Sequence, residues 1–126
     1  MNLQIKDGEF VCIIGHSGGG KSTLLNILAG LQLPSRGRVV IDGKPLKGPG
    51  TERAIVFQHY SLFPWMTARN NVVFGIQQAK KGLKRPQAVE LAEAYLKKVG
   101  MEKAMDKYPY ELSDGMQQRV SIARAL

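Results

Sequence analysis

The sequence predicts an α/β fold with an antiparallel β side piece and a separate helical part. Three observations predict it. An apolar, β-rich run at residues 10–14 leads through a glycine-rich loop into an amphipathic segment, which is the order strand, loop, helix. An Asp-Gly pair at residues 42–43 separates two short β-prone segments, as in a hairpin. After Pro64 the apolar residues recur mainly with a helical period.

The composition fits a globular chain of at most one domain, with 126 residues of which 44% are hydrophobic. No apolar run approaches the roughly 18 residues of a bilayer-spanning helix, and the N-terminus lacks the regions of a signal peptide. Cys12, the single cysteine, is predicted to be a buried thiol in a reducing compartment. The net charge of +8 would suit an anionic partner. The basic residues are scattered, however, which favours a solvated face over a nucleic-acid footprint.

The segment after the glycine loop is predicted to be a helix with one buried face. Gly30 is placed to end this helix, and Pro34 prevents its restart. The face follows the spacing i, i+3, i+4, i+7 and consists of Leu24, Ile27, Leu28 and Leu31.

Two further β elements are predicted before the helical part. Residues 38–46 form the hairpin around the Asp-Gly turn, and Pro45 implies that its return strand lies at a sheet edge. After a loop at residues 47–50, the apolar segment 54–57 predicts a second buried strand that ends at Gln58.

Three helices are predicted in the remaining chain. One spans residues 70–81, the next runs from Pro86 to a stop at Gly100, and the last begins near Ser113 and Asp114. Their predicted buried residues are Val73 and Ile76, with Phe74 as a further candidate, in the first helix, Val89, Ala92, Leu96 and Val99 in the second, and Met116, Val120 and Ala123 in the third.

The glycine-rich loop fits the phosphate-binding pattern G-x-x-x-x-G-K-[ST]. Glycines let successive backbone N–H groups point at an anion, and the following helix N-terminus favours negative charge. Lys21 would reach the β- and γ-phosphates, and the Ser22 hydroxyl would bind Mg²⁺. The alternative, a glycine-rich turn whose lysine binds nothing, is disfavoured by the flanking strand and helix. The predicted phosphate-binding residues are Gly15, His16, Ser17, Gly18, Gly19, Gly20, Lys21, Ser22 and Thr23.

A second informative stretch is Leu112-Ser113-Asp114-Gly115-Met116. Taken alone, it indicates only the N-cap of an amphipathic helix. Together with the upstream phosphate loop, it makes the chain resemble the ATP-binding-cassette (ABC) ATPases, the nucleotide-binding subunits of ABC transporters. Residues 15–23 resemble the Walker A loop, Gln58 resembles the Q-loop, and residues 112–116 resemble the family signature. The resemblance covers the whole chain.

This resemblance implies an incomplete P-loop NTPase core that binds ATP and Mg²⁺. Residues 1–66 would be part of the nucleotide-binding core, residues 67–112 the helical subdomain, and residues 113–126 the signature motif and its helix. Together they would make up a single partial ABC ATPase domain.

The resemblance also implies roles for single residues. Gln58 would contact Mg²⁺ or the attacking water and, with Lys21, would serve catalysis. Ser22 and Gln58 would be the metal contacts, and without the other motifs Gln58 would be read as a polar residue at a strand end. Ser113 and Gly115 would reach the γ-phosphate held by a second subunit. The apolar cluster of Tyr60, Leu62, Phe63 and Trp65 is interpreted either as core or as a contact with the membrane subunit.

Residues 9–18 and 56–65 resemble the importer subunits for nitrate, sulfonate, taurine and bicarbonate. This implies an ATPase that couples ATP binding and hydrolysis to the import of a small anion, on the cytoplasmic face of a bacterial cell membrane. The implied partners are a membrane permease subunit, a second ATP-binding subunit and a periplasmic or lipid-anchored substrate-binding protein, with no nucleic acid. The alternatives are a non-catalytic nucleotide-binding fragment and a soluble ABC ATPase without a role in transport.

The chain departs from the family pattern in two ways. Asp114 stands where the family has the first of two signature glycines, and its charge is expected to weaken binding of a γ-phosphate across subunits. The Walker B strand, the catalytic glutamate, the D-loop and the switch histidine would follow Leu126, and the aromatic residue that stacks on adenine would precede Met1. The chain is therefore expected to be an internal fragment with exposed apolar surface and strand edges, low stability alone and no appreciable ATP hydrolysis alone.

Overall fold

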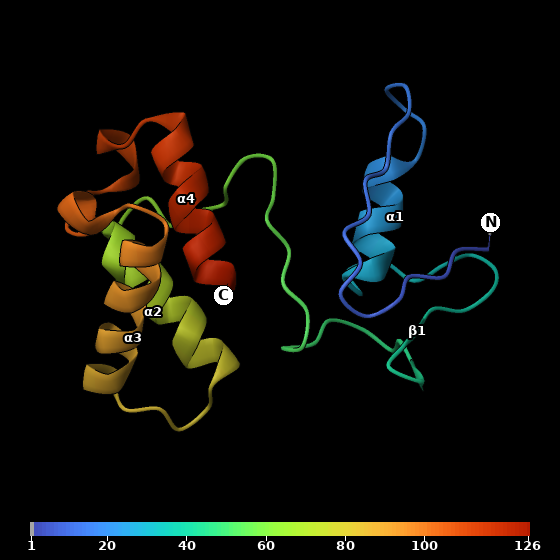
Figure 1. Cartoon of the computed structure of the whole chain (residues 1–126), viewed down its shortest axis with the longest axis horizontal. Coiled ribbons are helices and arrows are strands. Elements are labelled where there is room, and N and C mark those ends of the chain that lie inside the picture. The colour runs from blue at the N-terminus through green and yellow to red at the C-terminus, as the bar shows by residue number, and fades with distance from the viewer. Residues whose placement is uncertain (1) are drawn as a thin grey trace. The chain divides into compact units, whose positions relative to one another are not determined.

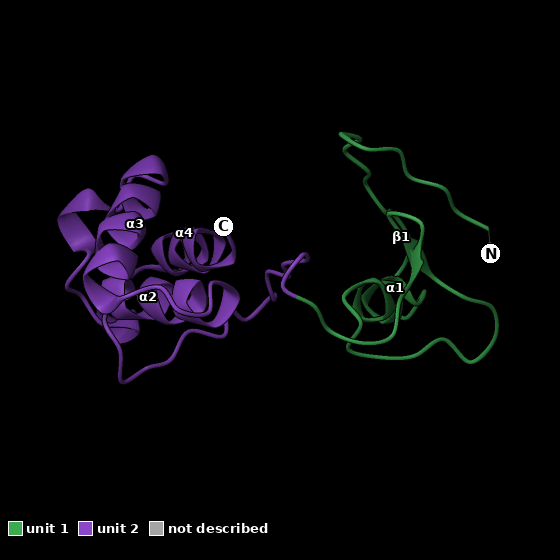
Figure 2. Ribbon diagram, turned by 90° about the horizontal axis from the view of Figure 1, so that it is seen from below, with its two compact units in different colours: residues 1–50 green, residues 51–126 purple. Residues whose placement is uncertain are grey.

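The computed structural model describes residues 2–126, which belong to two compact units that meet between Gly50 and Thr51 (Figure 2). The first unit contains helix α1 (Lys21–Leu28) and a two-stranded sheet of β1 (Val40–Ile41) and β2 (Lys44–Pro45). The second unit contains helices α2 (Ala68–Ala79), α3 (Arg85–Lys98) and α4 (Asp114–Ala125), with the short 3-10 helices η1 (Glu102–Ala104) and η2 (Pro109–Glu111) between α3 and α4 (Figure 1). None of the helices within residues 2–126 has the length and apolar character needed to cross a bilayer.

Helix α1 ends at the glycine that the sequence predicts. Gly30 has a φ of +77°, and the N–H of Leu31 donates to the carbonyl of Asn26 at 2.9 Å, which is the pattern of a glycine-terminated helix. A Cβ on Gly30 would lie 2.2 Å from the carbonyl oxygen of Gly48. Glycine is therefore required here both by the backbone angle and by the close approach of the loop at residues 47–50.

The predicted buried face of α1 is wrong. No residue of this helix is buried, and Leu31 beyond its end is 51% exposed. Leu24, Ile27 and Leu28 are only partly covered. The spacing of the apolar residues is helical, but few side chains of the described part of the first unit pack over that face.

The hairpin is confirmed. Val40 pairs with Pro45 and Ile41 pairs with Lys44 in an antiparallel register. Between the strands, Asp42 and Gly43 have φ values of 50° and 74°. Positive φ at both central residues matches the right-handed twist of the strands and explains the Asp-Gly pair.

The strands predicted at residues 10–14 and 54–57 are not formed as strands in the described part of the chain. A strand needs a neighbour that pairs with its backbone N–H and C=O groups, and the sheet described within residues 2–126 consists of β1 and β2. Phe10 is 97% exposed and Ile14 is 90% exposed. Cys12 is exposed as well, so the prediction of a buried thiol is wrong.

The hydrophobic core of the described residues lies in the second unit, where α2, α3 and α4 pack side by side (Figure 1). Alanines at several contact positions let the helices approach closely. The core consists of Ala68, Val72, Val73, Ile76, Ala88, Ala92, Leu96, Met101, Ala104, Met105, Leu112, Val120 and Ala123.

The three predicted helices of this unit are confirmed, with small shifts of their ends. Helix α2 begins two residues earlier than predicted because the Thr67 hydroxyl accepts a hydrogen bond from the N–H of Asn70 at 3.2 Å. Helix α3 begins at Arg85, so Pro86 is its second residue. Helix α4 begins at Asp114, as predicted.

Most of the predicted buried residues of these helices are confirmed. These are Val73 and Ile76 in α2, Ala92 and Leu96 in α3, and Val120 and Ala123 in α4. Phe74 is 37% exposed, so its predicted burial is wrong. Val89, Val99 and Met116 are only partly buried at the margin of the core.

Candidate nucleotide site and signature helix

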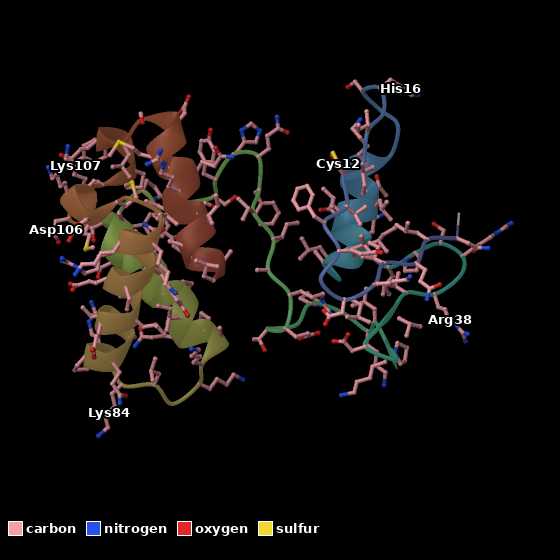
Figure 3. The ribbon with its side chains drawn as sticks, in the orientation of Figure 1. Cys12, His16, Arg38, Lys84, Asp106 and Lys107 are labelled. Carbon is pink, nitrogen blue, oxygen red and sulfur yellow. The ribbon has the colours of Figure 1, made fainter. Side chains whose placement is uncertain are left out.

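The loop at residues 15–20 has a backbone shape that depends on glycine. Gly18 and Gly20 have φ values of 80° and 81°, in the left-handed region that side chains disfavour. The N–H of Gly19 donates to the carbonyl of His16 at 3.1 Å, and a Cβ on Gly19 would lie 3.0 Å from that oxygen. The consecutive glycines thus form a tight turn directly before α1, with His16 at the tip of the loop (Figure 3).

Lys21 folds back over this loop. It is the first residue of α1, and its Nζ donates to the carbonyl of Gly15 at 2.7 Å and to that of His16 at 2.6 Å. The ammonium group is therefore held within the loop that precedes its own helix. A mobile point charge at this position suits contact with phosphate oxygens.

The N-terminus of α1 carries donors that its own helix does not use. Gly20 is the N-cap, no side chain caps it, and the first turn contains no acidic residue. The N–H groups of the first turn lack partners within the helix, and Ser22 and Thr23 are exposed. Backbone donors, an ammonium and a hydroxyl at a helix N-terminus fit a polyphosphate, and the Ser22 hydroxyl is the kind of oxygen ligand that Mg²⁺ takes.

The signature residues lie at the exposed start of α4. The hydroxyl of Ser113 accepts a hydrogen bond from the N–H of Met116 at 3.4 Å, so Ser113 is the N-cap. Asp114 is the first residue of the helix, where the helix dipole stabilises a negative charge. Gly115 is exposed, and no heavy atom lies within 4 Å of the place where its Cβ would be. The backbone of this turn is therefore accessible.

Gln58 is exposed, and the chain that follows it is held by α4. The Ser121 hydroxyl donates to the carbonyl of Tyr60 at 3.0 Å, and Arg124 donates to the carbonyls of Tyr60 and Ser61 at 3.2 and 2.7 Å. Partial burial of the guanidinium lowers the pKa of Arg124 by desolvation. The helix that begins with the signature motif thus contacts the segment that begins with Gln58.

A second attachment fixes the chain a few residues further on. Asn71 of α2 is completely buried. Its Oδ1 accepts from the N–H of Phe63 at 2.8 Å, and its Nδ2 donates to the carbonyls of Phe63, Met66 and Thr67 at 3.2, 3.1 and 3.1 Å. One side chain therefore satisfies four backbone groups of the segment before α2.

The sequence did not reveal Asn71, Ser121 or Arg124. A signal existed, because each is a polar residue next to an apolar one on the packed side of an amphipathic helix. Such a residue is buried only when it has partners. The partners of Ser121 and Arg124 are backbone groups distant in sequence from α4, and those of Asn71 lie in the segment before α2.

The aromatic residues after Gln58 form a partly exposed cluster. The ring of Phe63 lies 5.4 Å from that of Trp65 and 5.0 Å from that of Phe74, the latter in an edge-to-face arrangement. Trp65 is 69% exposed, whereas Phe63 is half-buried. The cluster has a packed side on α2 and an open side.

The described structure therefore has the phosphate loop in the first unit and Gln58, Ser113 and Gly115 in the second. Helices, a small antiparallel sheet and a glycine-lysine loop at a helix N-terminus define a nucleotide-binding protein of the phosphate-loop class. The chain belongs to the ABC transporter family, whose profile matches residues 1–126.

Related proteins and solved structures agree with this class. The chain is 51% identical over 126 residues to a nitrate import ATP-binding protein of Synechocystis sp., covering 100% of this chain and 47% of that protein. It is 50% identical to a bicarbonate transport ATP-binding protein of the same organism, with 100% of this chain and 19% of that protein covered. A dimeric ATP-binding cassette bound to ADP and Pi matches with a TM-score of 0.89 and 39% identity, over 99% of this chain and 59% of that one. The chain thus spans less than half the length of these two transport proteins.

Proposed function

We propose that the chain is the part of an importer ATP-binding subunit that binds the triphosphate of ATP and carries the signature helix. The observation that carries this proposal is Lys21, whose ammonium is held within the glycine loop at the uncapped start of α1. The nitrate import and bicarbonate transport proteins, which are 51% and 50% identical to this chain, support an inorganic or small organic anion, such as nitrate, sulfonate or taurine, as the transported substrate.

In this function the loop amides would donate to the phosphates, and Lys21 would move from its carbonyl partners onto the β- and γ-phosphate oxygens. Mg²⁺, when bound, would supply charge neutralisation at these oxygens, with Ser22 and Gln58 as its side-chain contacts. Gln58 can donate and accept hydrogen bonds and would orient a water. Ser113 and Gly115 would present the start of α4 to the nucleotide of a second subunit.

The proposed partners are a second ATP-binding subunit, a membrane permease subunit and a substrate-binding protein. A dimeric cassette among the similar structures supports the first, and the transport relatives support the second. The open side of the aromatic cluster, with Trp65 exposed, is the surface of the second unit that would face the permease. The protein would then lie peripherally on the cytoplasmic face of the membrane.

Nucleotide binding is tested by equilibrium titration of the complete protein that carries this chain with a fluorescent ATP analogue and Mg²⁺. Lys21→Ala is expected to weaken binding by at least about tenfold, since a hydrogen bond to a charged group contributes about 1.5–3 kcal/mol. Lys44→Ala, an exposed lysine of the hairpin in the same unit, is the matched control and should bind like the wild type. Equal affinities of the wild type and the K21A variant would refute the proposed site.

Phosphate release distinguishes an ATPase from a nucleotide-binding module without catalysis. We expect Lys21-dependent release from the complete protein and none from residues 1–126 alone, because phosphoryl transfer needs an oriented water and a well-anchored metal as well as a phosphate cradle. Turnover by the isolated chain that disappears in the K21A variant would contradict this expectation. Binding without turnover in the complete protein would favour the module.

A further inference from the structure

Two consecutive residues after Gln58 have a backbone conformation that neither favours. Tyr60 has a φ of 57° and Ser61 a φ of 51°. Left-handed residues other than glycine occur singly and seldom, and such strain persists only where the surroundings hold it in place. Strained backbone two residues from a predicted functional side chain therefore needs a specific support.

The support comes from α4 and consists of three hydrogen bonds to two adjacent carbonyl groups. Each terminal nitrogen of Arg124 donates to one of these carbonyls. Nη1 lies 2.7 Å from the oxygen of Ser61, and Nη2 lies 3.2 Å from the oxygen of Tyr60. The Ser121 hydroxyl is the second donor to Tyr60, at 3.0 Å. A planar guanidinium presents its donors to two acceptors in a rigid fork, whereas the donors of an ammonium rotate on a flexible stem.

The position of Arg124 is itself fixed by its neighbours. Its guanidinium lies over the ring of Phe63, 5.8 Å from the centroid. Gly75 of α2 lets both the side chain and the backbone of Arg124 come close, because a Cβ there would lie 2.7 Å from Cγ and from the backbone carbonyl oxygen of Arg124. A glycine inside a helix weakens that helix, so its presence at this contact is explained by the passage of Arg124.

We propose that Ser121 and Arg124 are positioning residues for Gln58: they hold the left-handed pair Tyr60–Ser61 and thereby fix the direction from which Gln58 is presented. This inference rests on the role proposed above for Gln58. It makes the orientation of Gln58 depend on the docking of α4, the helix that begins with the signature motif. Affinity for nucleotide, which the phosphate loop supplies, does not depend on this support.

The test measures KM for ATP and kcat in the complete protein, together with hydrogen exchange of the amides at residues 59–62. Arg124→Ala should lower kcat by at least about tenfold through misplacement of Gln58, leave KM within about twofold, and speed exchange of these amides. Arg124→Lys should fall between, because an ammonium lacks the rigid planar fork of a guanidinium and holds the two carbonyls less firmly. Arg119→Ala, which removes an exposed arginine of the same helix, is the matched control and should behave like the wild type.

Gly75→Ala provides an independent route to the same result. It strengthens the helix propensity of α2, while its Cβ would clash with Cγ and with the backbone carbonyl oxygen of Arg124. A loss of kcat with intact helical circular dichroism would therefore come from altered docking of Arg124 and this part of α4, and not from a weakened α2. The positioning role also predicts that the combined effect of G75A and R124A on kcat is smaller than the sum of the single effects, since both disturb the support of Tyr60 and Ser61.

The outcomes separate the two proposals. Nucleotide binding that depends on Lys21, combined with an unchanged kcat in the R124A variant, overturns the positioning role and leaves the proposed function intact. Unchanged exchange at residues 59–62 in that variant overturns the support itself. A wild-type protein without Lys21-dependent binding refutes the proposed function, and the role for Gln58 falls with it.

Discussion

Replacement of Asn71 by alanine tests how the chain between Gln58 and α2 is held. Asn71 is completely buried and is the only described side chain that bonds to both the N–H and the carbonyl of Phe63. Alanine keeps the helix propensity of α2 high but removes the acceptor and both donor hydrogens. The backbone groups of Phe63, Met66 and Thr67 then lose this partner in a site that water reaches poorly.

The expected loss of stability follows from those contacts. Each hydrogen bond contributes a net ~1 kcal/mol, and a buried N–H left without an acceptor costs about 1–3 kcal/mol. The volume that alanine leaves empty adds to this. We expect the N71A variant to lose about 3 kcal/mol. For a unit of this size, each 1 kcal/mol lowers the melting temperature by about 4–8 °C.

Trp65 reports on this change, because it is the single tryptophan and lies in the segment that Asn71 holds. Thermal and urea unfolding are followed by its fluorescence and by circular dichroism at the helical band. Asn70→Ala is the matched control. Its neighbouring side chain is partly exposed and accepts one bond, from Arg85 at 3.3 Å, so its loss should stay below about 1 kcal/mol. Equal losses in the N70A and N71A variants would refute the reasoning.

The N71D variant gives the pH dependence of the same site. A carboxyl group keeps the acceptor for the N–H of Phe63 but, when ionised, faces three carbonyl oxygens. Burial and these oxygens raise its folded-state pKa above the unfolded value of about 4. The penalty is therefore full above the folded pKa and disappears as the pH falls towards the unfolded one. This would be contradicted if the unfolding free energy of N71D, measured relative to that of N71A, did not rise as the pH is lowered.

Three other changes test separate features. Gly30→Ala should destabilise the end of α1, because the φ of +77° is unfavourable for alanine and its Cβ would lie 2.2 Å from a carbonyl oxygen; unchanged protection of the α1 amides in hydrogen exchange would contradict this. Arg69→Ala should lower the unfolding free energy by about 1 kcal/mol, and by less at high salt. The reason is that Nε of Arg69 lies 3.0 Å from a carboxylate oxygen of Glu93 and that the guanidinium contacts Asp106. A loss that does not depend on salt would assign the effect to packing. Asp114→Gly should tighten ATP-dependent dimerisation of the complete protein, since it removes a negative charge beside the proposed γ-phosphate contact; analytical ultracentrifugation that finds no change would refute this.

The backbone shape of the loop at residues 15–20 could be predicted from the sequence, because it depends on local properties. The left-handed angles at Gly18 and Gly20, the turn at Asp42 and Gly43 and the helix stop at Gly30 all depend on what a single residue allows its own backbone. Capping of α4 by Ser113 is equally local. The family resemblance rests on the same short stretches.

The sequence determined local geometry and helix positions, since each follows from neighbours within one turn of chain. Only the tertiary structure decided which polar side chains enter the core and what they hold. Asn71 and Arg124 bond to backbone groups eight and about sixty residues away along the chain, and no periodicity encodes such partners. The segment at residues 10–14 differs from its predicted strand for the same reason. Its composition suits a strand, but strand pairing and burial depend on distant neighbours, and in the described structure Phe10 remains exposed.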